Sequence, residues 1–174
     1  MGYPHPTVEV PGVHPHIADE IRNIRFADAN SESLLAGLLD ANANCAQGHV
    51  CATAWVLNSD HTMTLLVKHK TLGWSTPGGH LQLSETTAVA AMRELREETG
   101  LQLHPSESHP AIVHPSISTS PSVHTHWNVG WLFHVDINQP LTAEDGAKLR
   151  FFNCDELPTG ASDLVSIIAL LRKI

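Results

Sequence analysis

The chain has 174 residues, 42% of them hydrophobic, which is enough to enclose one main core with a short extension beside it. Its formal net charge is -8, so its overall field repels nucleic-acid backbones and anionic membranes, and we expect no duplex nucleic-acid partner. An acidic protein that handles phosphorylated molecules usually needs a bound divalent cation to invert the local charge.

The first segment, residues 1–16, is rich in proline and histidine, which is typical of an extended or poorly ordered arm. It lacks the basic head and apolar stretch of a secretion signal, and no run of the chain approaches the length of a membrane span. The cysteines are widely spaced and form no CxxC pair, so we interpret them as reduced thiols: Cys45, Cys51 and Cys154. We therefore expect a cytoplasmic protein with no membrane partner.

The apolar spacing of residues 17–44 is helical. Three residues in the first half keep a three-to-four spacing: Ile21, Ile24 and Arg25. Ser31 or Ser33 could cap a second helix. That helix would carry four leucines: Leu34, Leu35, Leu38 and Leu39. We interpret residues 1–45 as an arm and helical extension packed on the main domain. A dimer contact is the alternative, so the expected state is a monomer or a homodimer.

Strand-like patterns follow the extension. Residues 50–58 and 62–70 are β-rich runs joined by Ser59 and Asp60, which predicts a hairpin. The Pro-Gly-Gly sequence at residues 77–79 then interrupts any regular element and permits an unusual turn.

A helix is predicted from about residue 85 to 99, because Ser84 precedes a run of helix formers and Gly100 stands where a left-handed C-cap is wanted. Four later runs have strand character: residues 101–105, 108–114, 124–137 and 148–153. An amphipathic helix is expected over residues 162–174. This order predicts the α+β class, with a mixed β-sheet in an α/β/α sandwich, over residues 46–174.

The predicted central helix has two chemically different faces. Five residues would pack against the sheet: Ala88, Ala91, Met92, Leu95 and Thr99. Three glutamates share another face at positions i, i+3 and i+4: Glu94, Glu97 and Glu98. Their mutual repulsion costs about 0.2 to 0.5 kcal/mol per pair, and acids in the last turn oppose the helix dipole.

Something should compensate this charge. Arg93 can pair with Glu97 and reach back toward Glu85, but one guanidinium cannot neutralise the whole cluster. A hard divalent cation such as Mg²⁺ or Mn²⁺ can. The small Ala90, one turn before Glu94, would leave room there for ions and phosphate oxygens.

These residues belong to a longer pattern. The stretch GHLQLSETTAVAAMRELREETGL, residues 79–101, matches every fixed position of G-x5-E-x7-R-E-U-x-E-E-x-G-U, where U is a bulky aliphatic residue. It resembles the Nudix box, the signature of the Nudix hydrolase family. The surrounding strand pattern suits the Nudix sandwich over about residues 46–174, whereas residues 1–45 lie outside the resemblance.

The resemblance implies that this helix holds catalytic Mg²⁺ or Mn²⁺. It assigns as ligands the three glutamates that the charge argument selects: Glu94, Glu97 and Glu98. The carbonyl of Gly79 is a further ligand that only the family implies. Glu85 and Arg93 look like the pair that orients the helix and its ligands.

The implied reaction is attack of a metal-activated water on a phosphorus of a nucleoside diphosphate linked to a group X, or of a nucleoside triphosphate. The expected substrate is thus a small nucleotide or another diphosphate. Glu94 or Glu98 in the box could be the general base; Glu144 or Asp145, on a later loop, are the other candidates. A plain solvated position is the alternative for Glu144.

Two other functional classes stay open. A non-catalytic Nudix-like nucleotide-binding or regulatory module would normally have lost box acids or gained a DNA-binding domain, and neither feature is present in the sequence. An enzyme like isoprenyl-diphosphate isomerase would need a cysteine and a glutamate in its site, which the scattered cysteines do not clearly support.

Histidine is unusually frequent, with 13 residues. By strand alternation, His124, His126 and Asn128 share one face, so they are candidate substrate contacts, with a structural role as the alternative. With His114 nearby in sequence, a second transition-metal site is conceivable, although no HExxH motif or cysteine partner supports it.

The tryptophans offer candidates for stacking on a nucleotide base. Trp74, beside the glycine turn, is the best placed of them. Trp127 and Trp131 are ambiguous, because tryptophan in a strand more often belongs to the core.

Overall fold

The computed structural model describes residues 15–23, 25–26, 29–31, 33, 48–69, 73–106, 111–118, 124–144, 146–159 and 162–173. Its helices are α1 (Pro15–Asn23), α3 (Thr87–Thr99) and α4 (Ser162–Leu171). Its strands are β1 (Gly48–Leu57), β2 (Met63–His69), β3 (Gly73–Ser75), β4 (Gly78–His80), β5 (Ile112–Ser118), β6 (His124–His134) and β7 (Lys148–Asn153). No helix in these ranges is long and apolar enough to cross a membrane.

The strands form one mixed sheet in the order β3-β2-β1-β6-β5, with β4 also paired to β1 and β7 to β2. The pairing of β1 with β6 is parallel along the whole of β1, and the other pairs are antiparallel. The run from Cys51 to Leu57 is buried throughout, as expected for a central strand covered on both faces. β1 is therefore the strand that brings distant parts of the chain together.

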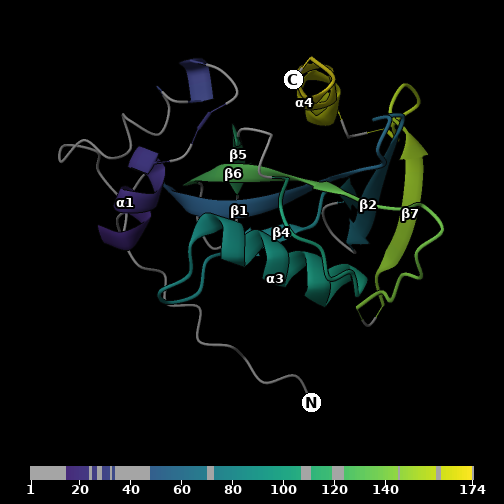
Figure 1. The fold of residues 1–174 in the computed structure, drawn as a ribbon, viewed down its shortest axis with the longest axis horizontal. Helices are drawn as coiled ribbons and strands as arrows, with labels where there is room; N and C mark the ends of the chain where they lie inside the picture. The colour runs from purple at the N-terminus through teal and green to yellow at the C-terminus, as the bar shows by residue number, and fades with distance from the viewer. Residues whose placement is uncertain are drawn as a thin grey trace.

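Helices α3 and α4 cover opposite faces of the sheet (Figure 1). Because side chains alternate along a strand, Ala54 and Val56 of β1 pack with Leu95 on the α3 side, whereas Trp55 packs with Ile168 on the α4 side. These two apolar clusters hold the layers together. The expectation of an α+β fold with a mixed sheet and an N-terminal helix is confirmed.

The N-terminal helix α1 packs on the edge of this sandwich near β5. Ile17 is buried against Ala111, Val113 and Val129. The carboxylate of Glu20 accepts hydrogen bonds from the first residues of α3. The division of the chain at residue 45 stays a prediction, as does the choice between monomer and homodimer.

The structure corrects several predicted boundaries. Helix α3 begins at Thr87 rather than 85, because Thr86 caps it by accepting from the Val89 N–H at 3.3 Å. Ser84 instead lies in the preceding turn with a φ of 67°. The C-cap prediction is confirmed, because Gly100 has a φ of 75° and donates its N–H to the Arg96 carbonyl.

The predicted strand at residues 101–105 does not form. Leu101 is buried in the α3-side cluster, and Leu103 packs against it. The alternating apolar residues of this segment therefore contact the core although the segment pairs with no strand in the described part of the chain. Strand β5 covers residues 112–118, so it overlaps the end of the strand predicted at 108–114 and continues beyond it, whereas residues 108–110 lie outside the described residues.

The second predicted helix is only partly described. Residues 29–31 and 33 are helical, so neither Ser31 nor Ser33 is an N-cap, because helical residues precede each of them. Ser31 instead accepts a hydrogen bond from the Val113 N–H at 3.0 Å. The four leucines of that prediction, and Cys45, lie outside the described residues.

Candidate active site

The acidic face of α3 is held next to the short strand β4. The cap at Thr86 and the αL turn at Gly100 define the two ends of the helix, and the buried Ala91 and Leu95 fix its rotation against the sheet. Ala90 is also fully buried in this cluster, so the expectation that it leaves room for ions is wrong. The space at the site is provided by glycine in β4 instead.

Gly79 makes this close approach of helix and strand possible. It pairs with Ala52 of β1, and a Cβ placed on it would lie 2.5 Å from Oε1 of Glu94. Any larger residue would therefore push the carboxylate away from the β4 backbone. The close approach of the Glu94 carboxylate explains why residue 79 is a glycine, which the sequence pattern alone does not show.

Arg93 organises the carboxylates around it. Its Nε and one terminal nitrogen donate to both oxygens of Glu85, at 2.7 and 2.9 Å. Its other terminal nitrogen donates to Glu94 at 2.7 Å and to Glu97 at 3.1 Å, and a further hydrogen bond of 2.9 Å reaches the His80 carbonyl. One guanidinium thus ties α3 to the loop before it and to β4.

These contacts act on the titration of Glu85 and Arg93. Burial raises the pKa of Glu85, but hydrogen bonds from Arg93 and the Gln82 N–H, together with the charge of Arg93, outweigh it and leave the pKa below its usual range. Hydrogen bonding to Glu85, followed by that to Glu94, raises the pKa of Arg93. Both groups stay charged near neutral pH.

Glu98 is in a very different environment. Its side chain is 8% exposed, its carboxylate accepts from the Gly78 N–H at 3.3 Å, and His69 Nε2 lies 3.5 Å away. Burial and then the charge of Glu94 raise the pKa of Glu98 to about 8. Burial also raises the pKa of Glu94, although Arg93 opposes this shift. The site therefore holds carboxylates whose negative charge is poorly compensated.

The loop before β7 meets the end of α3 at this point. The Thr142 N–H donates to the Thr99 carbonyl at 2.8 Å, and the Glu144 N–H donates to the Glu98 carbonyl at 3.4 Å. The charge of Glu144 contributes to the raised pKa of Glu98, so the loop acid and the helix acid are electrostatic neighbours. Asp145, the other loop candidate, lies outside the described residues.

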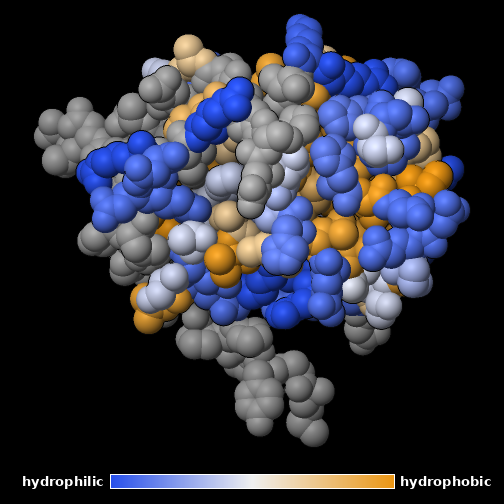
Figure 2. Space-filling model, in the orientation of Figure 1, coloured by the Kyte–Doolittle hydropathy of each residue, from blue (hydrophilic) through white to orange (hydrophobic). Residues whose placement is uncertain are grey.

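The donor set fits a hard divalent cation. Glu94 lies against Gly79 of β4, Glu98 accepts from the Gly78 N–H, and Glu97 is joined to Glu94 through Arg93. The charge of Arg93 is already shared with Glu85. Oxygen-only donors with surplus negative charge suit Mg²⁺ or Mn²⁺ rather than softer ions. In Figure 2 strongly hydrophilic residues gather over α3.

The described contacts of Trp74 and Asn128 are with residues other than the glutamates. Trp74 packs edge-on against Phe152, with ring centroids 4.9 Å apart, and belongs to the α4-side cluster. The Asn128 amide donates to the His114 carbonyl and to Ser116 Oγ, both at 2.9 Å. His124 lies at the start of β6, and its side chain is outside the described part of the chain. Substrate contact by these residues stays a prediction.

Trp127 and Trp131 pack partly buried against the apolar clusters, in agreement with the core interpretation. Trp131 also donates its indole N–H to Thr87 Oγ1 at 3.0 Å. It therefore helps to hold the start of α3 on the sheet.

Sequence reasoning missed one group of residues. His126 lies with His49, Cys51 and His80, and the ligating atoms of the four residues are all within 4.8 Å of one another. The expected absence of a cysteine partner is thus wrong, because Cys51 supplies one. Burial, followed by the charge of Glu94, raises the pKa of Cys51 to about 12. The only local signal was the His-Val-Cys alternation at residues 49–51.

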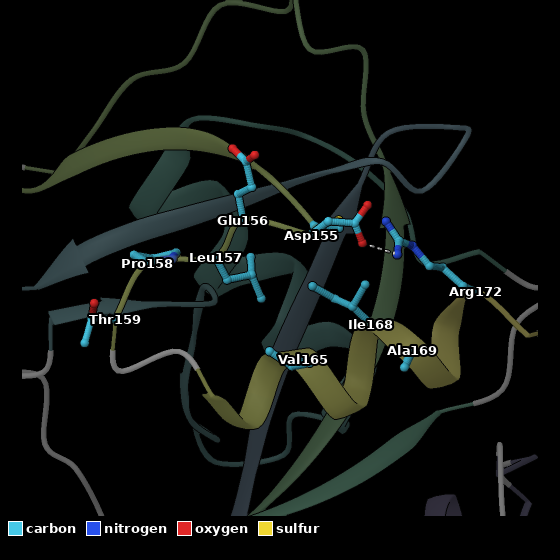
Figure 3. Close-up of a pocket in the computed structure, with 10 residues that line it drawn as sticks. Asp155, Glu156, Leu157, Pro158, Thr159, Val165, Ile168, Ala169 and Arg172 are labelled. Atoms are coloured by element: carbon cyan, nitrogen blue, oxygen red, sulfur yellow. Dashed lines mark hydrogen bonds and ion pairs between the residues drawn. The ribbon is translucent and has the colours of Figure 1, made fainter.

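A separate pocket opens on the α4 side of the molecule. It is lined by residues 154–159, which follow β7, and by one face of α4 (Figure 3). Arg172 closes one end by donating to Asp155 at 2.7 Å. None of the box glutamates lines this pocket.

Comparison with known proteins gives one family match. A model described as the NUDIX domain matches residues 48–171. Among curated proteins, a 34-residue segment covering 20% of this chain is 56% identical to the m7GpppN-mRNA hydrolase NUDT17 of Danio rerio. That match spans 11% of the relative's length.

Several solved structures share the fold. A NUDIX-family hydrolase from Clostridium perfringens has a TM-score of 0.53 and 20% identity, covering 71% of this chain and 95% of that one. The E. coli dihydroneopterin triphosphate pyrophosphohydrolase has a TM-score of 0.54 and 14% identity, covering 69% and 94%. A MutT protein from Methanosarcina mazei Go1 has a TM-score of 0.54 and 18% identity, covering 74% and 97%.

Proposed function

The chain belongs to the NUDIX domain family, and on this premise we propose that it is a Mg²⁺- or Mn²⁺-dependent pyrophosphohydrolase. Its proposed substrates are nucleoside diphosphates linked to another group, or nucleoside triphosphates. The observation that carries the proposal is the acidic face of α3, where Glu94 and Glu98 contact the two glycines of β4 and Glu97 is held beside them by Arg93. Free thiols at Cys51 and Cys154 agree with a cytoplasmic location.

The metal ligands of the proposal are the carboxylates of three residues: Glu94, Glu97 and Glu98. The carbonyl of Gly79 is the fourth. A divalent ion bound there would supply Lewis-acid stabilisation of phosphate charge and a lowered pKa for bound water. Side chains of the protein would position the ligands and accept the proton of the attacking water.

Arg93 and Glu85 are proposed as positioning residues. Their two-point pair fixes the guanidinium, which in turn holds the carboxylates of Glu94 and Glu97 and the backbone of His80. Because Arg93 restrains these carboxylates, they lose little further conformational entropy when substrate binds. Loss of Arg93 would release all of these contacts together.

Glu98 is the general base in this proposal. Its carboxylate is the most deeply buried of the three on the acidic face of α3, and a general base must lie within reach of the attacking water. It would accept the proton of the attacking water as the new bond to phosphorus forms and the anhydride bond breaks. Glu94 and the nearby Glu144 are the alternatives for this role.

Hydrolysis would yield two phosphorylated products, or a nucleoside monophosphate and pyrophosphate from a triphosphate. The substrate panel should therefore include nucleoside triphosphates, nucleoside diphosphate sugars and dinucleotides. A capped dinucleotide of the m7GpppN type belongs in the panel, because the relative from Danio rerio acts on such caps. Mass spectrometry of the products identifies both the substrate and the bond that breaks.

The test compares the wild type with Glu97→Gln and Glu98→Gln in the presence of Mg²⁺ or Mn²⁺. We expect kcat to fall by about a hundredfold or more in each variant, because each loses a charged ligand or the base. Glu156→Gln, an exposed glutamate after β7, is the matched control and should keep wild-type rates. Undiminished turnover in both box variants would overturn the assignment.

The two competing classes give different results in the same assay. A non-catalytic module would bind nucleotides without releasing phosphate or pyrophosphate. An isoprenyl-diphosphate isomerase would convert its substrate into a single isomer without consuming water, so that product would take up no oxygen from isotopically labelled water. Label in one phosphate product supports hydrolysis.

A further inference from the structure

A second group of metal-binding side chains lies on the face of the sheet opposite α3. His49 and Cys51 alternate along β1 with Trp55, which belongs to the α4-side cluster, so all three point to the same face. The acidic residues of α3 are on the other side. This group is therefore a separate set of ligands from the carboxylate site, although the charge of Glu94 reaches Cys51. The proposal for it does not rest on the proposed hydrolysis.

Strand pairing explains why these residues meet. In the sheet register His49 stands beside His126 of β6, and Cys51 stands beside His80 of β4. Directly paired residues in neighbouring strands have Cβ atoms about 4.5 to 5.5 Å apart, close enough to share one ion. The central position of β1 thus brings together residues separated by up to seventy-seven positions in the chain.

The three imidazoles surround a common point. The ring of His49 lies 4.7 Å from that of His80 and 4.7 Å from that of His126, and the remaining pair is 5.2 Å apart. The rings are tilted by 52° to 87° rather than stacked in parallel. This arrangement lets several ring nitrogens face inward at once.

The burial of the four residues forms a gradient. Cys51 is 2% exposed and forms the floor, His49 and His126 are half-buried, and His80 is exposed. An ion could reach the group from solvent at His80 and meet the sulfur at the bottom. Because the cluster is buried at Cys51 and open to solvent at His80, it can both hold and exchange a metal ion.

The chemistry of the donors selects the class of ion. Three imidazoles and one thiolate suit Zn²⁺ and related transition metals, whereas Mg²⁺ and Ca²⁺ prefer carboxylate, carbonyl and water oxygens. Tetrahedral bonds of about 2.0 to 2.3 Å place the ligand atoms about 3.3 to 3.6 Å apart. The four ligating atoms lie within 4.8 Å of one another, so small rotations of the side chains would bring them to the distances of a tetrahedral site.

We propose that His49, Cys51, His80 and His126 form a binding site for one transition-metal ion of the Zn²⁺ class. Binding replaces the Cys51 thiol proton, which is released to solvent, by a bond from sulfur to the metal. The ion would cross-link β4, β1 and β6. It would also stiffen β4, where His80 follows Gly79 and accepts a hydrogen bond from Arg93.

The test uses Co²⁺ as a spectroscopic probe on the full chain freed of metal by a chelator. Excess Mg²⁺ is added first to occupy the carboxylate site. We expect one Co²⁺ per chain to give intense visible bands of a tetrahedral ion and a thiolate-to-cobalt charge-transfer band. Zn²⁺ should abolish both signals by displacement, and further Mg²⁺ should not.

Two variants test proposed ligands, and a third is their control. Cys51→Ser should lose the charge-transfer band, and His126→Gln should weaken Co²⁺ affinity by at least tenfold. The matched control is Cys154→Ser, which removes the other described buried thiol and should leave the spectrum unchanged. Circular dichroism establishes that each variant is folded.

The wild type alone also decides the question if a variant fails to fold. X-ray absorption at the zinc edge of the Zn²⁺-loaded protein should show one sulfur and three nitrogen ligands. An oxygen-only shell, a Co²⁺ spectrum without a charge-transfer band, or loss of that band in Cys154→Ser in place of Cys51→Ser would overturn the proposal.

Discussion

The carboxylate of Glu98 is buried beside like charges, which is unfavourable unless a proton or a cation compensates it. Its raised pKa of about 8 is the response of the metal-free protein to this position. The neighbouring glutamates Glu94 and Glu97 are instead held by Arg93. Single residues in this site therefore have separate tasks, even though the sequence motif presents them as one acidic run.

The titration of Glu98 predicts how stability depends on pH in the metal-free protein. Its pKa rises from the ordinary value of 4.5 to about 8 on folding, so between these values the folded state binds more protons than the unfolded chain. The free energy of unfolding should fall as pH rises through this window and become level above it. Urea denaturation with a chelator at a series of pH values measures the effect.

Glu98→Gln should flatten that profile, because its side chain carries no charge at any pH. Glu156→Gln is the control, since this glutamate is exposed, and its profile should match the wild type. A wild-type stability that rises between these pH values would contradict the environment described for Glu98.

A second prediction at this scale concerns Gly79. In Gly79→Ala the new Cβ would overlap the carboxylate of Glu94, which must then move away from β4. We expect kcat/KM to fall by about tenfold to a hundredfold, because displacement of a catalytic group by about an ångström has that effect. Steady-state kinetics and circular dichroism test it; unchanged kcat/KM in a folded variant would refute the steric argument.

At the scale of elements, α3 is held at both ends by groups from other parts of the chain. Its first turn receives the carboxylate of Glu20 from α1, which accepts from the Thr87 N–H at 2.7 Å, Thr87 Oγ1 at 3.1 Å and the Ala88 N–H at 3.3 Å. Its last turn meets Thr142. A carboxylate at a helix N-terminus satisfies open N–H groups and interacts favourably with the helix dipole.

Glu20→Ala should therefore lower the free energy of unfolding by about 1 to 2 kcal/mol. Glu20→Gln keeps an acceptor oxygen and should lose less. Asp19→Ala is the matched control, because the side chain of the neighbouring Asp19 forms an exposed pair with Arg22, and its loss should cost less than about 0.5 kcal/mol. Equal effects of Glu20→Ala and Asp19→Ala in urea denaturation would show that the contact with α3 contributes nothing.

At the scale of the whole molecule, the described part of the chain consists of a sheet between α3 and α4 with α1 at its edge (Figure 1). Apolar clusters on both faces make β1 the centre of the structure. A third cluster joins Ile17 to β5 and β6. The N-terminal helix is thus part of the same packed body as the sheet.

This packing predicts that Ile17→Ala destabilises the entire fold rather than α1 alone. Removal of a side chain that is 4% exposed should cost about 2 to 5 kcal/mol. Urea unfolding should remain a single transition, followed equally by tryptophan fluorescence and circular dichroism. Val165→Ala, on the exposed side of α4, is the control and should change stability by less than about 0.5 kcal/mol. An early separate transition in Ile17→Ala would mean that α1 is only loosely attached.

The sequence by itself determined the features that depend on spacing along one element. The central helix, its acidic face and its Gly100 cap follow from local spacing, because residues three or four positions apart share a helix face. The mixed-sheet class followed from the order of the elements.

Only the tertiary structure decided which strands are neighbours. Strand pairing depends on contacts between distant segments, and it placed His126 beside His49 and Cys51 beside His80. The packing of α1 set the Glu20 carboxylate on α3. The same non-local packing buried Ala90 and left residues 101–105 without a ladder partner. Alternation along a strand shows which residues share a face, but it carries no information about the strand that will lie next to it.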